Sequence, residues 1–237
     1  MGDSAIAEEA GVALDAVPVL LGGAMRSVGA PSNPNARMPE EKRQRVVQDA
    51  YRALARQGRE LQWPMAHPRR TVSAMRLILG APPSRQRAVA LELYEAYWLR
   101  GEDVATAAVL EDIGSRHGLD VNAVLSDPEI KAQLRQNTDQ LVARGGFGVP
   151  TFEVGHHFYW GVDRIDQVRH ALSLAPEPLA VGPRRGGRVA FYHDVSSPYS
   201  YLASRRVSLV LEANGVEVDW KPFLLGAVFK TIGGPLV

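Results

Sequence analysis

The chain contains two stretches that match each other without a gap. Residues 11–22 read GVALDAVPVLLG and residues 215–226 read GVEVDWKPFLLG. The match extends backward to the pair Ser4 and Ser208, and forward to the pair Pro31 and Pro235. Since the spacing is about one domain length, we interpret the match as a tandem duplication seen through a displaced window. The first copy would then lack its opening strand and the start of its first helix, and the second would stop shortly after its second strand.

Composition narrows the class of protein. The 237 residues are 46% apolar and 22% charged with a net charge of +1, which is typical of a globular protein of one or two domains and gives no basic stripe for nucleic acid. The longest apolar runs are far shorter than the ~20 residues of a membrane span, and the first residues do not resemble a signal peptide, so we expect a cytoplasmic protein. The absence of cysteine excludes disulfides, thiol catalysis and cysteine metal sites. The six histidines show no metal-ligand spacing, and no metal is expected.

The order of predicted elements indicates an α/β fold. Apolar periodicity and turn residues predict helices at residues 4–10, 39–57, 71–79, 84–99, 104–117, 128–144, 163–174 and 199–214, and strands at 12–19, 149–154, 158–160, 188–194 and 216–223. This order is typical of a thioredoxin-like sheet with a helical insertion at about residues 36–145. We expect a first copy at residues 1–174, a linker at 175–187 that is rich in proline and glycine, and the start of a second copy at 188–237.

A serine turn lies between the strand at residues 188–194 and the following helix. The sequence there is Ser196-Ser197-Pro198, with proline at the first helical position. A helix N-terminus that follows a strand is a common place to hold an anionic group.

Four motifs together resemble the 2-hydroxychromene-2-carboxylate isomerase family. They are FYHDVSSPYSYLA at residues 191–203, PFLLGAVFK at 222–230, GFGVPTF at 146–152 and WGVDR at 160–164. That family belongs to the DsbA-like thioredoxin superfamily, beside the kappa-class glutathione transferases. The resemblance implies a glutathione-dependent enzyme of aromatic hydrocarbon catabolism that interconverts 2-hydroxychromene-2-carboxylate and trans-o-hydroxybenzylidenepyruvate.

Ser197 is the catalytic candidate. The thiol oxidoreductases of this superfamily carry Cys-x-x-Cys where this chain has Ser-Pro-Tyr-Ser, and a hydroxyl there can donate a hydrogen bond to a bound thiolate at a helix N-terminus. Ser197 would thereby activate the sulfur of glutathione, which acts as a transient nucleophile. The alternative is that Ser196 and Ser197 only cap the helix.

The resemblance also implies a glutathione site in the first copy. In similar proteins the peptide bond that corresponds to Val149-Pro150 is cis, and the backbone before the proline pairs with the cysteinyl part of glutathione; the alternative is an ordinary trans proline at a strand start. An aspartate at the position of Asp163, with nearby backbone amides such as those of Gly161 and Val162, holds the glutamyl end. Asp163 could equally be the N-cap of its helix.

Two other functions stay open. One is a kappa-type glutathione transferase, which conjugates in place of isomerising. The other is a truncated or degenerate DsbA-like module without catalysis. The expected partners are a small aromatic carboxylate and glutathione, with no nucleic acid and no membrane, and a homodimer or a domain swap could bring Ser197 to a proline loop.

Overall fold

The computed structural model describes residues 3–29, 38–176 and 186–232, which divide into two compact units, Met1–Ala175 and Pro176–Val237. Each unit is considered by itself. Most of the predicted linker at residues 175–187 lies outside the described residues. Within the described ranges, no helix is both long enough and apolar enough to cross a bilayer.

The first unit is mainly helical. In chain order its elements are α1 (Asp3–Ala10), α2 (Leu21–Ser27), α3 (Glu40–Arg56), α4 (Val72–Gly80), α5 (Pro83–Trp98), α6 (Ala107–Arg116), α7 (Val121–Ser126), α8 (Pro128–Ala143), β1 (Thr151–Val154), β2 (His157–Trp160), the 3₁₀ turn η2 (Val162–Arg164) and α9 (Ile165–Ala171). The structure confirms the helices predicted at residues 39–57, 71–79, 84–99 and 128–144. They are predictable because their apolar spacing and the proline and glycine residues at their ends are signals in the local sequence.

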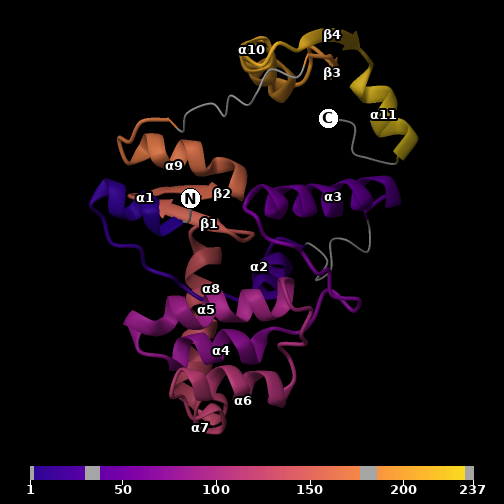
Figure 1. Cartoon of the computed structure of the whole chain (residues 1–237). Helices are drawn as coiled ribbons and strands as arrows, with labels where there is room; N and C mark the ends of the chain where they lie inside the picture. Colours follow the sequence, from indigo (N-terminus) through magenta and orange to yellow (C-terminus); the bar gives the residue numbers. More distant parts are fainter. Residues whose placement is uncertain (1–2, 30–37, 177–185, 233–237) are drawn as a thin grey trace. The chain divides into compact units, whose positions relative to one another are not determined.

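The main hydrophobic cluster is formed by α4 to α7, and Figure 1 shows these helices grouped with α8. The buried Leu134 adds α8 to the core of the unit. Its largest fully buried side chains are Leu77, Val89, Leu110, Ile113 and Leu134. These side chains come from α4, α5, α6 and α8, which bury their apolar faces and leave their charged faces in solvent.

The hairpin of β1 and β2 follows this block. The two strands are antiparallel, with Thr151 opposite Trp160 and Val154 opposite His157, and α9 packs on both. Gly155 makes the turn with a φ of +61°, a conformation that glycine adopts without strain.

The second unit is a strand–helix–strand–helix segment. Its elements are β3 (Arg188–His193), α10 (Pro198–Ala213), β4 (Glu217–Pro222) and α11 (Leu225–Ile232). Strands β3 and β4 are parallel, with Arg188 opposite Glu217 and His193 opposite Pro222, and α10 provides the crossover between them.

One predicted strand is wrong. Residues 12–19 alternate like a strand, yet the structure gives them no strand conformation, and residues 12–17 are exposed. Alternation of apolar and polar residues indicates only which side chains could face a core, whereas a strand also needs a neighbouring strand for its backbone hydrogen bonds. None of the described segments pairs with residues 12–19. Three helices were not predicted, namely α2, α7 and α11.

Candidate functional site

The serine turn lies between β3 and α10. The hydroxyl of Ser197 accepts a hydrogen bond from the backbone N–H of Ser200 at 3.2 Å, which caps the first turn of the helix. A hydroxyl carries one donor hydrogen as well as its lone pairs, so the capping bond leaves that hydrogen able to reach another group. Ser197 is partly exposed. Capping and donation to an anion are therefore compatible at this residue.

Asp194 holds the serine turn in shape. Its Oδ1 accepts from the N–H and from the hydroxyl of Ser196, both at 2.8 Å, and its Oδ2 accepts from the N–H of Leu225 at 2.7 Å. These bonds, first the one from Leu225 and then those from Ser196, hold the pKa of Asp194 below its usual value. The carboxylate thus ties the end of β3 to the start of α11. The sequence analysis missed this role, although Asp two residues before a serine-proline turn is a common turn signal.

The proline loop lies between α8 and β1 in the first unit. The Val149-Pro150 peptide bond is cis, as predicted. The carbonyl of Pro150 accepts a hydrogen bond from the N–H of Gly161 at 2.9 Å, which joins this loop to the turn after β2. The side chain of Val149 is exposed, and its backbone N–H and carbonyl have no hydrogen-bond partner among the described residues. An exposed peptide with both groups free is able to pair with an extended ligand.

The turn after β2 places Gly161, Val162 and Asp163 beside the proline loop. Gly161 has a φ of +104°, a backbone conformation that favours glycine, and a Cβ there would also lie 2.6 Å from Oδ1 of Asp163. Gly161 occupies the N-cap position of η2, and no side chain caps that turn. The interpretation of Asp163 as an N-cap is therefore wrong, because the N-cap position lies at Gly161, two residues earlier. Its carboxylate is 69% exposed and lies 3.5 Å from the guanidinium of Arg164.

The structure thus brings together the five predicted glutathione contacts of the first unit, Val149, Pro150, Gly161, Val162 and Asp163. The rings of Phe147 and Trp160 flank them, with their centroids 4.8 Å apart. Ser197 belongs to the second unit.

A histidine with aromatic neighbours lies elsewhere in the first unit and was not predicted. His67 precedes a second cis proline, and its Nδ1 lies 2.9 Å from the hydroxyl of Tyr97, which also accepts from the N–H of Arg69 at 3.2 Å. The rings of Trp63 and Trp98 lie against His67. Burial lowers the pKa of His67 and raises that of Tyr97. His67 is therefore mainly neutral at pH 7 and serves as a packed hydrogen-bond partner.

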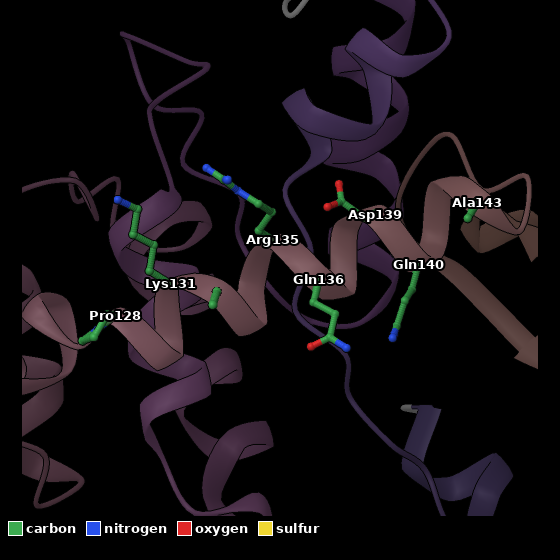
Figure 2. Close-up of a pocket in the computed structure, with 8 residues that line it drawn as sticks. Pro128, Lys131, Arg135, Gln136, Asp139, Gln140 and Ala143 are labelled. Atoms are coloured by element: carbon green, nitrogen blue, oxygen red, sulfur yellow. The ribbon is translucent and has the colours of Figure 1, made fainter.

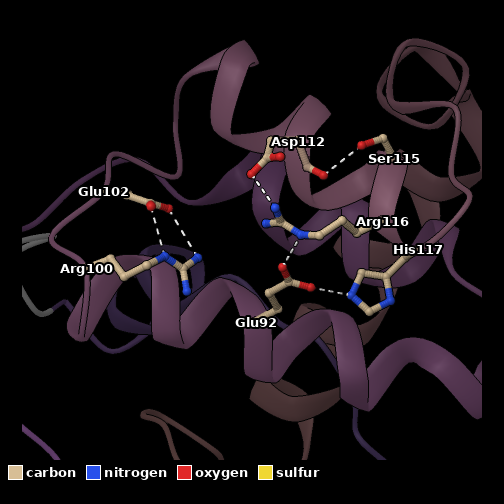
Figure 3. Close-up of polar contacts among 7 residues, drawn as sticks. All are labelled: Glu92, Arg100, Glu102, Asp112, Ser115, Arg116 and His117. Atoms are coloured by element: carbon tan, nitrogen blue, oxygen red, sulfur yellow. Dashed lines mark hydrogen bonds and ion pairs between the residues drawn. The ribbon is translucent and has the colours of Figure 1, made fainter.

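A charged cluster joins α5 to α6, as Figure 3 shows. One oxygen of Glu92 accepts from Nε of Arg116 at 2.6 Å, and the other lies 2.6 Å from Nε2 of His117. Arg116 also pairs with Asp112 one turn earlier on α6. The cluster ties two helices of the core block together, which accounts for its residues without a ligand.

A shallow hollow runs along α8 (Figure 2). Among the residues that the structure describes, those that line it all belong to that helix, and they include Lys131, Arg135 and Asp139. None of its lining residues is a predicted site residue, and a hollow bordered by the exposed face of one helix lacks the convergent walls of a ligand site.

Comparison with known proteins gives the family and the fold. The model of the DSBA-like thioredoxin domain matches residues 3–173 and again residues 188–236. Human glutathione S-transferase kappa 1 is 26% identical over 131 residues, which are 48% of this chain and 58% of the human protein, so the match spans less than two thirds of that relative. The solved structure of a 2-hydroxychromene-2-carboxylate isomerase superposes with a TM-score of 0.58 at 18% identity, over 72% of this chain and 84% of that one.

Proposed function

Because the chain belongs to the DSBA-like thioredoxin domain family, we propose that it is a glutathione-dependent isomerase that interconverts 2-hydroxychromene-2-carboxylate and trans-o-hydroxybenzylidenepyruvate. The observation that carries the proposal is the serine turn: a hydroxyl with a free hydrogen stands at the N-terminus of the 16-residue helix α10. The kappa-class glutathione transferase relative and the family match support glutathione as the cofactor.

The proline loop fits the cysteinyl part of glutathione. The free N–H and carbonyl of Val149 can pair with the peptide backbone of the cofactor, while Gly161 and Val162 keep the adjacent turn open to solvent. Asp163 is exposed and presents a carboxylate that can accept from the α-ammonium group of the glutamyl end. All five contacts come from two turns joined by the hydrogen bond between Gly161 and Pro150.

Ser197 would act on the sulfur. When bound, glutathione supplies a thiolate that can add reversibly to a conjugated double bond and leave after rotation about that bond. The hydroxyl of Ser197 would donate its hydrogen to the thiolate, and the amides at the start of α10 would add a favourable dipole. A hydrogen bond to a charged acceptor contributes about 1.5–3 kcal/mol, which corresponds to a fall of about one to two units in a thiol pKa.

A kappa-type transferase is the second candidate, favoured by the match to the human kappa-class protein. It would use the same thiolate and the same residues, but would form a stable conjugate. A truncated or degenerate DsbA-like module without catalysis is the remaining alternative, in which the chain binds glutathione weakly or only pairs with a partner.

We also propose that the two ranges matched by the family model are parts of two copies of one domain, with the divisions at residues 1–174, 175–187 and 188–237. The family match to both ranges and the sequence match between residues 11–22 and 215–226 support this origin. We propose the cytoplasm as its location, and a small aromatic carboxylate as its substrate.

Titration calorimetry with reduced glutathione at millimolar concentration is the first test. Binding is expected, and the absence of heat would reject both enzyme functions. Conversion of hydroxychromene carboxylate, followed by absorbance, then separates the isomerase from a transferase that conjugates chlorodinitrobenzene.

The role of Ser197 is tested by the thiol pKa of bound glutathione, read from the ultraviolet absorbance of the thiolate. Ser197→Ala is expected to raise that pKa, while Ser204→Ala, which removes only a bond to the carbonyl of Tyr201 within the same helix, should leave it unchanged. Ser197→Gly removes the hydroxyl at a capping cost of only a few tenths of a kcal/mol, so it separates helix capping from thiolate binding. An unchanged thiol pKa in both Ser197 variants would reject the role.

A further inference from the structure

Three hydrogen bonds around the serine turn form a closed ring within the second unit. The N–H of Ser197 donates to the carbonyl of Asp194 at 3.1 Å, and the N–H of Ser200 donates to the hydroxyl of Ser197 at 3.2 Å. The N–H of Asp194 completes the ring by donating to the hydroxyl of Ser200 at 3.4 Å. The oxygen of Ser197 is a member of this ring, so its position depends on the backbone of Asp194.

The side chain of Asp194 fixes that backbone from outside the ring. Its Oδ1 accepts two bonds from Ser196, and its Oδ2 accepts one from the N–H of Leu225, the first residue of α11. One residue earlier along each segment, the N–H of Phe223 donates to the carbonyl of His193 at 3.1 Å. Hydrogen bonds to an ionised acceptor are stronger than neutral ones, so the carboxylate is the main tie between the serine turn and α11.

The position of the Ser197 oxygen decides how well its hydrogen can serve a ligand. The oxygen accepts one bond from Ser200 and carries one hydrogen to donate. With the oxygen held in the ring, that hydrogen can reach a bound anion while the capping bond stays in place. If the turn loosens, the side chain gains access to other rotamers, in which the oxygen lies elsewhere. A bound thiolate would then receive the hydrogen bond only part of the time.

We propose that Asp194 is a positioning residue for the glutathione chemistry: its carboxylate, held by Ser196 and Leu225, keeps the hydroxyl of Ser197 in the orientation that donates to the sulfur. This inference rests on the proposed function and adds two things to it. Asp194 acts through Ser197, so its effect on the sulfur requires the serine hydroxyl. Helix α11 belongs to the site as well, because its first N–H holds the carboxylate.

Positioning and direct charge predict shifts of opposite sign in the thiol pKa of bound glutathione. A carboxylate near a thiolate disfavours the charged sulfur, so loss of the Asp194 charge alone would lower the thiol pKa. Loss of positioning weakens the bond from the Ser197 hydroxyl to the thiolate, which raises the thiol pKa. The three hydrogen bonds that Asp194 accepts place partial positive charge beside the carboxylate and weaken its repulsion of the sulfur. The loss of positioning is therefore expected to dominate.

The thiol pKa of bound glutathione, read from the absorbance of the thiolate, measures the effect. Asp194→Ala is expected to raise it by about 0.5–1 unit, a part of the shift that the whole hydrogen bond from Ser197 would give. Asp194→Asn keeps the shape and one acceptor oxygen, so it should give a smaller rise. In a Ser197→Ala chain, Asp194→Ala should raise the thiol pKa no further, since the two residues act in series. A fall in the thiol pKa, or an equal rise with and without the Ser197 hydroxyl, would overturn the proposal.

Leu225→Pro tests the link to α11 while the carboxylate stays in place. Proline lacks the N–H that Asp194 accepts, and the first position of a helix tolerates it. Leu225→Ala is the matched control, because it shortens the side chain and keeps the N–H. The thiol pKa should rise in Leu225→Pro relative to Leu225→Ala. Equal thiol pKa values in the two variants would reject the part assigned to α11.

Hydrogen exchange in the free protein separates this inference from the proposed function, because it needs no glutathione. The N–H of Ser200 has the Ser197 hydroxyl as its acceptor, so its exchange should quicken in Asp194→Ala and in Leu225→Pro. Unchanged exchange along β3 and β4 shows that the unit stays folded, and Asp194→Asn replaces the alanine variant if that variant unfolds. Faster exchange at Ser200 without glutathione binding would support the positioning of Ser197 while the proposed function fails. Unchanged exchange at Ser200 in a folded Asp194 variant overturns the positioning, whether or not glutathione binds.

Discussion

Replacing Thr138 by valine should loosen the N-terminal segment from α8. The hydroxyl of Thr138 accepts from the backbone N–H of Leu20 at 2.9 Å and donates to the carbonyl of Leu134 at 2.8 Å, and the residue is only 5% exposed. Valine keeps the methyl group, so packing changes little. The substitution removes one long-range hydrogen bond and leaves the donor of Leu20 unsatisfied.

The expected loss in the free energy of unfolding is about 1–2 kcal/mol. A net hydrogen bond contributes about 0.5–1.5 kcal/mol, and an unsatisfied donor costs about 1–3 kcal/mol when it is buried, but Leu20 is partly exposed and water can reach it. For a unit of this size each kcal/mol corresponds to roughly 2–4 °C in the melting temperature. Urea unfolding measures the loss, and hydrogen exchange should locate it at residues 11–27.

Thr231→Val is the matched control. Its hydroxyl donates to the carbonyl of Ala227 at 2.9 Å, the same bond to the preceding turn that Thr138 makes. Thr231 is exposed, however, and accepts no long-range bond from the residues that the structure describes. If both variants lose the same stability, or if exchange at residues 11–27 is unchanged in Thr138→Val, α8 does not anchor the N-terminal segment.

Three more substitutions probe the core, the turn after β2 and the serine turn. Leu77→Ala, at a fully buried site, should cost about 2–5 kcal/mol in urea unfolding, whereas Leu91→Ala at a site 49% exposed should stay within about 0.5 kcal/mol; equal losses would mean that the core is misassigned. Gly161→Ala should lower the melting temperature, because φ is +104° and the new Cβ would meet Oδ1 of Asp163 at 2.6 Å; an unchanged melting temperature would contradict that conformation. The pKa of Asp194 is lower in the folded protein than in the unfolded chain, where it is near 3.8, so the carboxylate contributes to stability above pH 3.8. This contribution is lost as the pH falls through the folded pKa. Asp194→Asn should remove this part of the pH dependence of stability, and chemical unfolding that gives the same acid profile for both proteins would refute the assignment.

The elements that the sequence predicts well are those whose signals are local. The helices at Glu40–Arg56 and Pro128–Ala143 follow from apolar spacing and from proline or acidic residues in the first turn. Helix α2 escaped prediction because its sequence, LGGAMRS, has two glycines directly after its first residue, and these favour a turn. It forms against α8, where Gly23 lets the backbone approach so closely that a Cβ would lie 3.0 Å from Thr138. Such an approach is a tertiary property that propensity does not contain.

The residues of the candidate site also differ in whether the local sequence predicts them. Val149, Pro150, Gly161, Val162 and Asp163 can be assigned from the sequence because the contiguous motifs GFGVPTF and WGVDR resemble those of the isomerase family. The bond that Asp194 accepts from Leu225 at the start of α11, and the contact of His67 with Tyr97 across 30 residues, join positions that no contiguous motif links. A site residue is thus predictable when it lies in a recognisable motif, and a contact with a distant partner must be found from the structure.

The two matching stretches show which structural features depend on the local sequence and which depend on a distant partner. Both close their preceding helix on a glycine and both open the next helix at a leucine, so these features follow from the sequence wherever it is placed. Only residues 217–222 become a strand, and they have β3 beside them, whereas residues 13–18 do not. The difference in strand formation therefore follows from the presence of a partner. For the same reason, whatever supplies a parallel neighbour to residues 13–18 should convert them to a strand without any change in their sequence.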